Sequence, residues 1–191
     1  QETGHYIDEL DLGGGFGIYY SEGDKPKKIE EYCNVILDSV EKKCEALGIK
    51  KPILTIEPGR SVVANAGITL YTVGTIKDIP GVRKYLSVDG GMTDNIRPAL
   101  YGAKYEALIA NKASEPMTDK VTIAGKCCES GDILIQDIQI QKAKSGDILA
   151  ILSTGAYGFS MASGYNKITR PAVVFVRNGE ARLVVKRQSY E

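Results

Sequence analysis

A carboxylate and a guanidinium occupy the first and last positions of Glu57-Pro58-Gly59-Arg60, directly after the apolar run at residues 53–56. That run is rich in β-branched residues and too short for a helix, so it predicts a buried strand. Parallel α/β proteins bind their ligands at the C-terminal ends of strands, which makes this turn a candidate binding site. A structural ion pair at a tight turn explains these four residues equally well when they are taken alone.

A glycine-rich stretch, Gly13-Gly14-Gly15-Phe16-Gly17, follows another strand-like run at residues 7–12. Consecutive glycines let the backbone approach a ligand closely, and their N–H groups can converge on an anion. The spacing fits neither the dinucleotide-binding fingerprint nor a Walker A loop. We therefore expect either an anion-binding bend or a plain turn here.

Three later stretches interrupt strand-like sequence with chemically useful side chains. Arg97 and Tyr101 stand four residues apart and would share a face if their segment were helical. A thiol and a carboxylate, Cys128 and Glu129, precede a turn, and Tyr157 is bracketed by glycines. Each stretch alone is also compatible with an ordinary connection between strands.

Together these residue types fit a phosphate-bearing aromatic cofactor and an acidic substrate. The glycines would receive the phosphate, and a carboxylate would keep a ring nitrogen protonated. For pyridoxal phosphate this second role matters most, because a cationic ring is the better electron sink. Arg60 and Arg97 favour a substrate with carboxylates, which guanidinium groups bind bidentately. Cys128 could deliver a proton to the reacting carbon.

The elements that position these residues begin with a β-α-β unit over residues 7–57. Asp24 is predicted to cap its helix, with Pro26 in the first turn, and Gly48 to end it. A parallel crossover then joins the two strands. The helix carries an apolar stripe at helical spacing, in which the two cysteines are expected to be core residues: Ile29, Cys33, Ile36, Leu37, Val40, Cys44 and Leu47.

After a predicted boundary near residue 66, the sequence changes to short β-branched and aromatic runs. The dipeptide Asn178-Gly179 between two such runs is a strong hairpin signal. We therefore expect residues 67–191 to be mostly antiparallel β structure, with these strands: 68–76, 85–89, 120–123, 133–140, 147–152, 173–176 and 182–185.

Composition limits the classes of function. The 191 residues contain 24 basic and 24 acidic side chains and no basic block, which argues against a nucleic-acid partner. No signal peptide or membrane-spanning run is expected. Four cysteines without a C-x-x-C motif, and one histidine, argue against structural zinc and a disulfide framework and favour a reducing cytoplasm, and no metal is expected. The first residue is Gln1, so we expect a piece of a longer chain.

At these motifs the sequence resembles the meso-diaminopimelate decarboxylases, which belong to the alanine-racemase-like (fold type III) class of pyridoxal phosphate enzymes. The resemblance covers the whole chain as the C-terminal portion of such an enzyme. It depends on five motifs in order: Gly13–Gly17, Glu57–Arg60, Asp89-Gly90-Gly91 with Asp94 and Arg97–Tyr101, Cys128–Asp132, and Gly155-Ala156-Tyr157.

This resemblance implies a fold and a reaction. Residues 1–66 would be the last strands and helices of a TIM-like (β/α) barrel that binds pyridoxal 5'-phosphate, and residues 67–191 an antiparallel β-sandwich or barrel domain. The enzyme would be a homodimer with shared active sites. It would remove CO₂ from the D-centre of meso-2,6-diaminopimelate to give L-lysine.

The resemblance also implies roles for individual residues. The cofactor phosphate would lie against Gly13, Gly14, Gly15, Gly59 and Arg60, the pyridine nitrogen against Glu57, and the cofactor as a whole against Tyr157. Substrate or phosphate oxygens would be held by Arg60, Arg97 and Tyr101, with Tyr157 also near the substrate. Cys128 and Glu129 would reach into the neighbouring subunit's site, the thiol at the proton-transfer position and the carboxylate near a substrate ammonium. Cys127 would be a bystander.

Two alternatives remain open. Ornithine, arginine or carboxynorspermidine decarboxylases belong to the same class, but Arg97 beside Tyr101 and the Cys-Glu-Ser-Gly-Asp motif favour a distal substrate carboxylate. A non-catalytic binding homologue is the other alternative. The family's Schiff-base lysine and its stacking histidine lie far upstream of the glycine loop, whereas only twelve residues precede Gly13 and His5 is wrongly placed. We therefore expect the missing N-terminal part of the enzyme to be needed for turnover.

Overall fold

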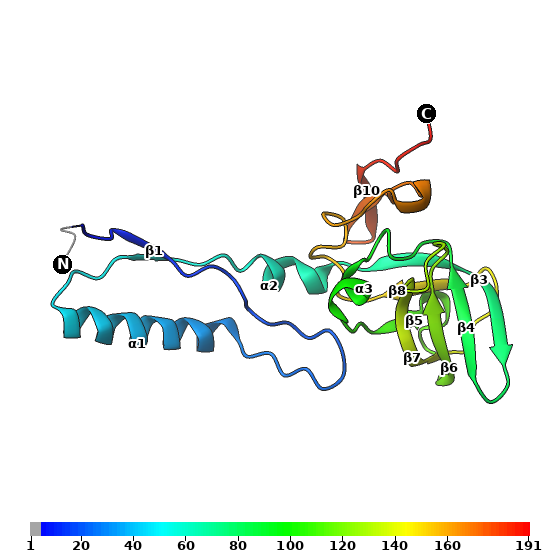
Figure 1. Cartoon of the computed structure of the whole chain (residues 1–191), viewed down its shortest axis with the longest axis horizontal. Helices are drawn as coiled ribbons and strands as arrows, with labels where there is room; N and C mark the ends of the chain where they lie inside the picture. Colours follow the sequence, from blue (N-terminus) through cyan, green and yellow to red (C-terminus); the bar gives the residue numbers. More distant parts are fainter. Residues whose placement is uncertain (1–4) are drawn as a thin grey trace.

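The computed structural model describes residues 5–191, so Gln1 and the expectation attached to it lie outside the described range. The chain forms an elongated arm that carries the N-terminal elements and a body of β-strands, joined by a short helical segment (Figure 1). A two-stranded hairpin near the C-terminus stands beside the body.

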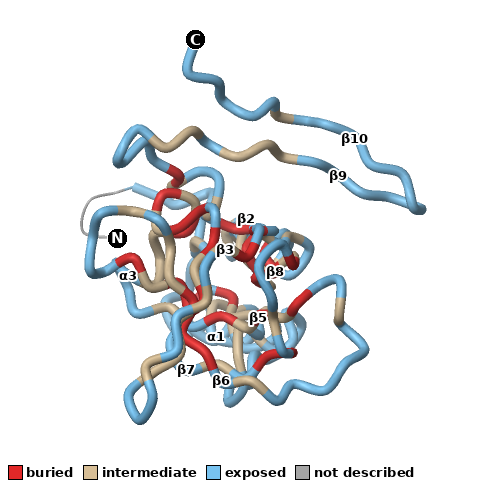
Figure 2. The backbone as a smooth tube through the Cα atoms, turned by 90° about the vertical axis from the view of Figure 1, so that its right-hand side faces the viewer, coloured by how far each residue is buried: buried red, intermediate tan, exposed pale blue. Residues whose placement is uncertain are grey.

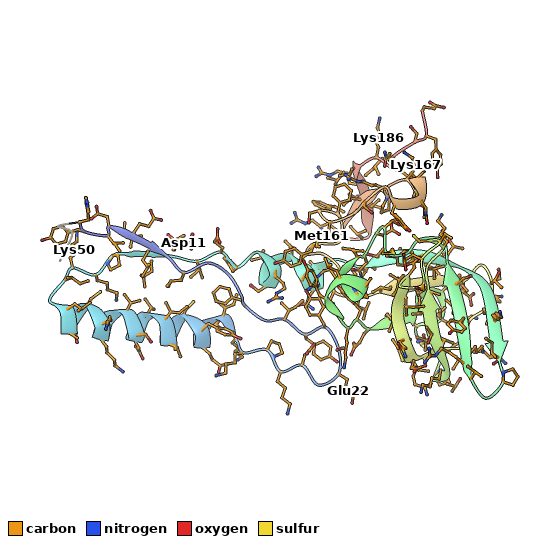
Figure 3. The ribbon with its side chains drawn as sticks, in the orientation of Figure 1. Asp11, Glu22, Lys50, Met161, Lys167 and Lys186 are labelled. Atoms are coloured by element: carbon orange, nitrogen blue, oxygen red, sulfur yellow. The ribbon has the colours of Figure 1, made fainter. Side chains whose placement is uncertain are left out.

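The arm is the predicted β-α-β unit. It consists of β1 (Glu9–Asp11), α1 (Ile29–Leu47) and β2 (Ile53–Thr55). The strands pair in parallel, with Glu9 opposite Ile53 and Asp11 opposite Thr55, which confirms the predicted crossover. The long segment between β1 and α1 runs to the body, reverses near Glu22 and returns to the arm (Figure 3).

The predicted start of the helix is wrong, although its predicted end is confirmed. Helix α1 begins at Ile29, where the backbone N–H of Lys28 donates to Glu31 Oε1 at 3.1 Å. Asp24 instead accepts hydrogen bonds from the backbone N–H groups of Tyr20 and Ser21, at 3.0 and 2.9 Å, and closes a turn. At the other end Gly48 adopts the left-handed conformation with φ 60°, which favours glycine.

The apolar stripe of α1 is only partly covered within this chain. Cys44 is buried, as expected for a core residue, but Cys33 is half-buried. Ile29, Leu37 and Leu47 are exposed. The arm therefore presents apolar surface that the described residues do not cover.

The body is a six-stranded mixed sheet with the strand order β5-β8-β3-β4-β6-β7. Its strands are β3 (Thr69–Ile79), β4 (Arg83–Val88), β5 (Ala107–Ile109), β6 (Met117–Ala124), β7 (Ile133–Gln141) and β8 (Ile148–Ile151). All of the predicted runs in this part are strands, but the three-residue β5 was not predicted.

The body was predicted to be mostly antiparallel, and four of the five strand pairings in its sheet are antiparallel. Strands β4 and β6 pair in parallel, with Tyr85 opposite Thr122, because the chain crosses the body between them. The two edge strands meet, since the backbone N–H of Ile109 on β5 donates to Gln141 Oε1 on β7 at 2.8 Å. The sheet is thus nearly closed around its own core.

The core of the body contains the side chains that point inward from these strands. Figure 2 shows the buried residues concentrated there, whereas the hairpin is exposed. Burial of each such aliphatic side chain contributes about 1.5–3 kcal/mol. The largest fully buried apolar side chains are Leu86, Ile109, Ile123, Ile140, Leu149, Ile151, Val73 and Val121.

The hairpin consists of β9 (Val173–Arg177) and β10 (Glu180–Val185) in a separate two-stranded sheet. Asn178 and Gly179 have φ angles of 52° and 80°, so the predicted Asn-Gly turn is confirmed. The remaining elements are short helical turns: α2 (Gly59–Val63), η1 (Ala64–Ala66), α3 (Arg97–Tyr101), η2 (Ala110–Lys112) and η3 (Tyr165–Lys167). Within residues 5–191, no helix is both long enough and apolar enough to cross a membrane.

A buried ion pair holds η2 to the start of β8. Asp147 is 2% exposed and accepts a hydrogen bond from Lys112 Nζ at 2.6 Å. Its carboxylate also accepts from Asn111 Nδ2 at 3.0 Å and from the backbone N–H of Lys144 at 2.8 Å. These hydrogen bonds, with that of Lys112 the strongest, lower the pKa of Asp147 to about 2.

This lowered pKa predicts a specific acid sensitivity. Because the pKa of Asp147 is lower in the folded chain than in the unfolded chain, its stabilisation is complete above about pH 4 and is lost as the pH falls toward 2. We expect Asp147→Asn to lower the free energy of unfolding by about 2 kcal/mol at pH 7. The difference between the two proteins, measured by urea denaturation, should shrink between pH 4 and pH 2. A difference that is constant with pH would contradict this assignment.

Candidate active site

The glycine bend and the acid–arginine turn lie side by side, because β1 and β2 are parallel neighbours and their C-terminal ends meet. The backbone N–H of Glu57 donates to the carbonyl oxygen of Gly13 at 2.8 Å. A Cβ atom on Gly14 would lie 2.6 Å from the carbonyl oxygen of Glu57, so only glycine allows this approach. Gly13 and Gly15 have φ angles of 69° and 88°, which also favour glycine.

An open hollow of about 680 Å³ lies between this turn and the loop that follows β8. Four of the predicted residues line it, namely Glu57, Gly59, Arg60 and Tyr157, and its volume is in the range of small-molecule sites. Gly13 and Gly14 lie beside Glu57, and glycines 13–15 are not among the lining residues. The remaining lining residues are Pro58, Val62, Val63, Gly155, Ala156 and Ser160.

Arg60 is anchored to the glycine bend. Its Nε donates to the carbonyl oxygen of Phe16 at 3.3 Å, and Phe16 is 5% exposed. The edge of the Phe16 ring packs against the Tyr32 ring, with their centroids 5.4 Å apart. Arg60 is thereby held beside the glycine-rich stretch and also lines the hollow.

The two walls of the hollow are joined by a close approach of two glycines. A Cβ atom on Gly155 would overlap the carbonyl oxygen of Val63, and one on Gly67 would overlap the Cα atom of Gly155. The Gly155 N–H donates to the carbonyl oxygen of Ala64 at 3.0 Å, and the Thr154 N–H to that of Gly67 at 2.9 Å.

Tyr157 follows this contact with a φ of 68°, which is rare for a residue other than glycine. Such conformations cluster at functional sites, where the surrounding structure maintains them. The contact between Gly67 and Gly155 fixes the start of the loop that carries Tyr157. This contact places Tyr157 in the lining of the hollow. The sequence analysis identified Gly155 but missed Gly67.

A further connection is made by Asn65, which the sequence analysis also missed. Its Nδ2 donates to the carbonyl oxygen of Tyr19 at 2.9 Å and to Ser153 Oγ at 2.8 Å. The Tyr19 hydroxyl donates to Glu106 Oε1 at 2.6 Å, and this bond raises the pKa of Tyr19. The segment after the glycine bend is thus bonded to the body at several points.

Arg97 lies in a cage of three tyrosine rings. Its Nη1 donates to the hydroxyl oxygens of Tyr20 and Tyr105, at 3.0 and 2.8 Å. Its guanidinium carbon is 5.3 Å from the centroid of the Tyr157 ring, which lines the hollow. Tyr101, the expected companion of Arg97, lies on α3 and is 64% exposed, so its role stays a prediction.

The loop between β6 and β7 presents Cys128 and Glu129 on the surface, and neither residue lines the hollow. The backbone N–H of Cys128 donates to Asn166 Oδ1 at 2.8 Å. Glu129 Oε1 accepts from the backbone N–H of Gly131 at 3.2 Å. The structure therefore does not bring this pair together with Glu57 and Tyr157 within one chain.

A buried carboxylate positions that loop. Asp132 is 3% exposed and accepts hydrogen bonds from the backbone N–H groups of Met92 and Cys127, at 2.6 and 2.8 Å. A Cβ atom on Gly91 or Gly125 would overlap its carboxylate. Burial, followed by the proximity of Asp132, raises the pKa of the Cys127 thiol to about 11. Cys127 is therefore a neutral thiol at physiological pH.

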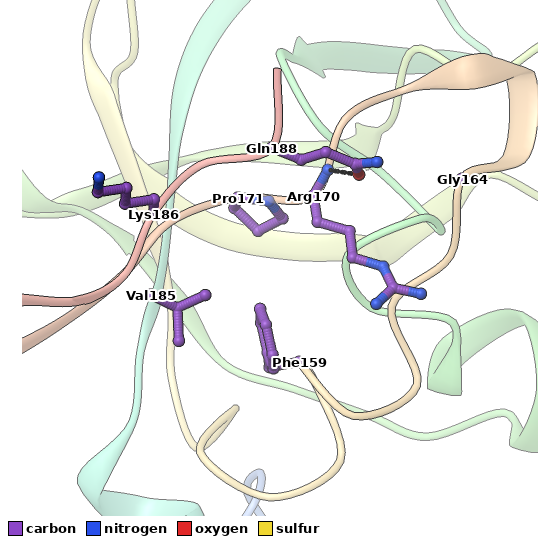
Figure 4. Close-up of a pocket in the computed structure, with 7 residues that line it drawn as sticks. All are labelled: Phe159, Gly164, Arg170, Pro171, Val185, Lys186 and Gln188. Atoms are coloured by element: carbon purple, nitrogen blue, oxygen red, sulfur yellow. Dashed lines mark hydrogen bonds between the residues drawn. The ribbon is translucent and has the colours of Figure 1, made fainter. Parts of the chain in front are cut away.

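A second hollow, of about 470 Å³, lies at the base of the hairpin (Figure 4). It is lined by Phe159, Gly164, Arg170, Pro171, Val185, Lys186 and Gln188. The backbone N–H of Arg170 donates to Gln188 Oε1 at 3.1 Å. Its lining contains none of the predicted site residues, so the first hollow is the candidate active site.

Comparison with known proteins identifies the family of this chain. A family model described as "Pyridoxal-dependent decarboxylase, C-terminal sheet domain" matches residues 17–155. The diaminopimelate decarboxylase of Bacillus subtilis (strain 168) is 60% identical over 182 residues, which are 95% of this chain and 42% of that protein. The diaminopimelate decarboxylase of Staphylococcus aureus (strain COL) is 55% identical over 190 residues, which are 99% of this chain and 45% of that protein.

A solved structure is similar over the same range. The diaminopimelate decarboxylase from M. jannaschii in complex with L-lysine superposes with a TM-score of 0.88 and 36% sequence identity, covering 99% of this chain and 42% of that one. The present chain thus spans less than half the length of the relatives it matches.

The close contact between Gly67 and Gly155 predicts that a methyl group added at either glycine destabilises the fold. We expect Gly155→Ala and Gly67→Ala each to lower the free energy of unfolding by about 2–3 kcal/mol, because the new Cβ would overlap backbone atoms. Gly164→Ala is the matched control, since a Cβ atom there would meet nothing within 4 Å and its φ is −100°. Urea denaturation followed by circular dichroism measures all three. Equal stability of the Gly155 and Gly164 variants would contradict the proposed constraint.

Proposed function

The chain belongs to the pyridoxal-dependent decarboxylase family, and from this premise we propose that it is the C-terminal part of a diaminopimelate decarboxylase. The complete enzyme would remove CO₂ from meso-2,6-diaminopimelate and release L-lysine. The observation that carries this proposal is the convergence of Glu57, Arg60 and Tyr157, from both parts of the chain, on one hollow beside the glycine bend.

Residues 1–66 would complete a TIM-like barrel, and residues 67–191 would form the β domain that follows it. The parallel pair of strands with its crossover helix supports this division, because parallel sheets are normally covered on both faces. The exposed apolar residues of α1 would then face neighbouring barrel elements. We place the enzyme in the cytoplasm, in agreement with its free cysteines.

The hollow fits a phosphorylated pyridine cofactor in its chemistry. Gly13, Gly14, Gly15 and Gly59, together with Arg60, would hold the phosphate with backbone N–H groups and one guanidinium. The Glu57 carboxylate would keep the pyridine nitrogen protonated, and Tyr157 would lie against the cofactor. When bound, pyridoxal 5'-phosphate would supply an electron sink for the bond to the departing carboxylate.

Arg97 gives the site its preference for an acidic substrate. Its guanidinium would pair with the carboxylate at the end of diaminopimelate that does not react, with help from Tyr101 or Arg60. Ornithine and arginine end in a cation at this position, so the same guanidinium would repel them. Glu57 and Arg97 thus separate two tasks, since the first acts on the cofactor and the second selects the substrate.

Cys128 and Glu129 would serve the active site of a second copy. Both residues are exposed and neither lines the hollow of its own chain, which supports a homodimer with shared sites. The Cys128 thiol would return a proton to Cα after CO₂ has left. Glu129 would accept a hydrogen bond from the substrate ammonium. Asp132 would hold both residues in place through the backbone of their loop.

Substrate selection is the direct test of the proposed function. The complete enzyme, loaded with pyridoxal 5'-phosphate, should release CO₂ from meso-diaminopimelate and form L-lysine, as measured by carbonate trapping and amino-acid chromatography. We expect kcat/KM for ornithine and arginine to be lower by at least about 100-fold, since their distal cation faces Arg97. Faster turnover of ornithine would assign the chain to another branch of the family. Binding of the cofactor without any turnover would favour a non-catalytic homologue.

The two neighbouring cysteines provide a matched test of proton transfer. In the complete enzyme Cys128→Ala should lower kcat about 100-fold, the usual size of a general acid contribution, with little change in cofactor affinity. Cys127→Ala should retain nearly the full kcat, because that thiol lies beside the structural carboxylate Asp132 and is assigned no contact with the substrate. Steady-state kinetics and cofactor titration measure both quantities. Equal losses in kcat and cofactor affinity for Cys128→Ala would make Cys128 a packing residue.

A further inference from the structure

The positive charge of Arg97 has no carboxylate partner among residues 5–191. The ion pairs found there join Lys51 to Glu41, Arg83 to Asp137, Lys84 to Asp119 and Lys112 to Asp147. Arg97 is half-buried and is bonded only to neutral phenols within the described range. A partly buried cation without a counter-charge is costly unless an anion binds to it.

Both phenols accept hydrogen bonds from the same nitrogen atom of the guanidinium. Arginine has five N–H donors, and both hydrogen bonds of Arg97 come from Nη1, which carries two of them. A carboxylate can bind bidentately either across Nη1 and Nη2 or across Nε and Nη2. Because Tyr20 and Tyr105 occupy Nη1, the edge formed by Nε and Nη2 is the one left for a carboxylate.

On the basis of the proposed function, we infer that Tyr20 and Tyr105 are positioning residues, which hold Arg97 so that its Nε–Nη2 edge receives the distal carboxylate of the substrate. The two phenols are neutral acceptors, so they orient the guanidinium without cancelling its charge. Burial raises the pKa of Tyr105, which keeps that phenol protonated.

The tyrosines themselves are rigidly placed. Tyr105 is 3% exposed and belongs to the body core, and the Tyr20 ring packs edge-on against it at 5.4 Å. The guanidinium carbon lies 5.2 Å from the Tyr20 centroid and 6.0 Å from the Tyr105 centroid, within range for cation–π attraction. The rotamer freedom of Arg97 is therefore lost before any substrate arrives, which favours tight binding of its carboxylate.

Tyr20 also connects this position to the glycine bend. It follows Gly17 by three residues, and the adjacent Tyr19 is bonded to Asn65 and Glu106. The same short segment thus leaves the proposed phosphate site and supplies one acceptor for Arg97. The distance between the phosphate site and the carboxylate site is consequently set by this segment, which suits a substrate of one fixed length.

The test compares two inhibitors that differ by one carboxylate. L-Lysine carries the carboxylate that Arg97 would hold, whereas cadaverine lacks it. In the complete enzyme we expect Tyr105→Phe and Tyr20→Phe each to weaken inhibition by L-lysine and to raise KM for meso-diaminopimelate about tenfold. That factor corresponds to the loss of one hydrogen bond to a charged group. Inhibition by cadaverine and kcat should change less than about twofold, because the distal carboxylate is bound equally before and during the reaction.

Tyr190→Phe, at an 81% exposed tyrosine remote from Arg97, serves as the control and should match the wild type. Unchanged inhibition by L-lysine in both variants would overturn the inference, as would an equal weakening for L-lysine and cadaverine, which indicates general structural damage. If Tyr105→Phe fails to fold, Tyr20→Phe at the half-buried ring carries the same test. A wild-type enzyme that does not decarboxylate meso-diaminopimelate would overturn the proposed function itself, and the two failures are therefore distinguishable.

Discussion

The contact between Gly67 and Gly155 is the constraint on which the candidate site depends. It brings the backbone that leaves α2 and η1 against the backbone that leaves β8, with no side chain between them. Glu57 and Arg60 flank the start of α2, shortly before Gly67. Tyr157 follows Gly155 by two residues and has a positive φ. A methyl group at either glycine would separate the walls of the hollow, so the site requires that both positions lack a side chain.

Three buried or half-buried charged groups, Asp132, Asp147 and Arg97, differ in the partners that surround their charge. Asp132 and Asp147 are fully bonded, the first by backbone N–H groups and the second by Lys112 and its neighbours. Their charges are compensated, and their role is to fix loops. Arg97 is oriented just as firmly, but by phenols that carry no charge. Within the described residues its charge remains uncompensated, which is the condition expected of a group that binds an anion.

Local patterns in the sequence were sufficient to predict much of the fold. Runs of β-branched residues located most strands of the body, Asn178-Gly179 located the hairpin, and Gly48 located the end of α1. The start of α1 was missed because Asp24 caps a turn of its own, and β5 was missed because three residues give too little periodicity. The parallel pairing of β4 with β6 depends on the path of the intervening chain, which no local pattern records.

The site was predictable in part, for the same reason. Adjacent residues such as Glu57 and Arg60 stand out as a motif, whereas the partners of Arg97 do not. Tyr20 is 77 residues away in the sequence and Tyr105 is eight, so only the folded chain brings them together. Gly67 likewise becomes meaningful only beside Gly155. Residues that touch a ligand tend to occur in recognisable motifs, but the residues that orient them are selected by packing between distant segments.

The same reasoning supports the proposal that the arm and the body contribute to one site. A parallel strand pair with one helix cannot cover its own apolar face, and the exposed residues of α1 show this directly. The arm therefore needs further elements for its stability, but it needs the body for its chemistry. Tyr19, Tyr20 and Asn65 bond it there through hydrogen bonds, and the Tyr20 ring also packs against Tyr105 of the body core. Because those contacts begin directly after the glycine bend, any displacement of the arm relative to the body would alter the proposed phosphate site and the orientation of Arg97 together.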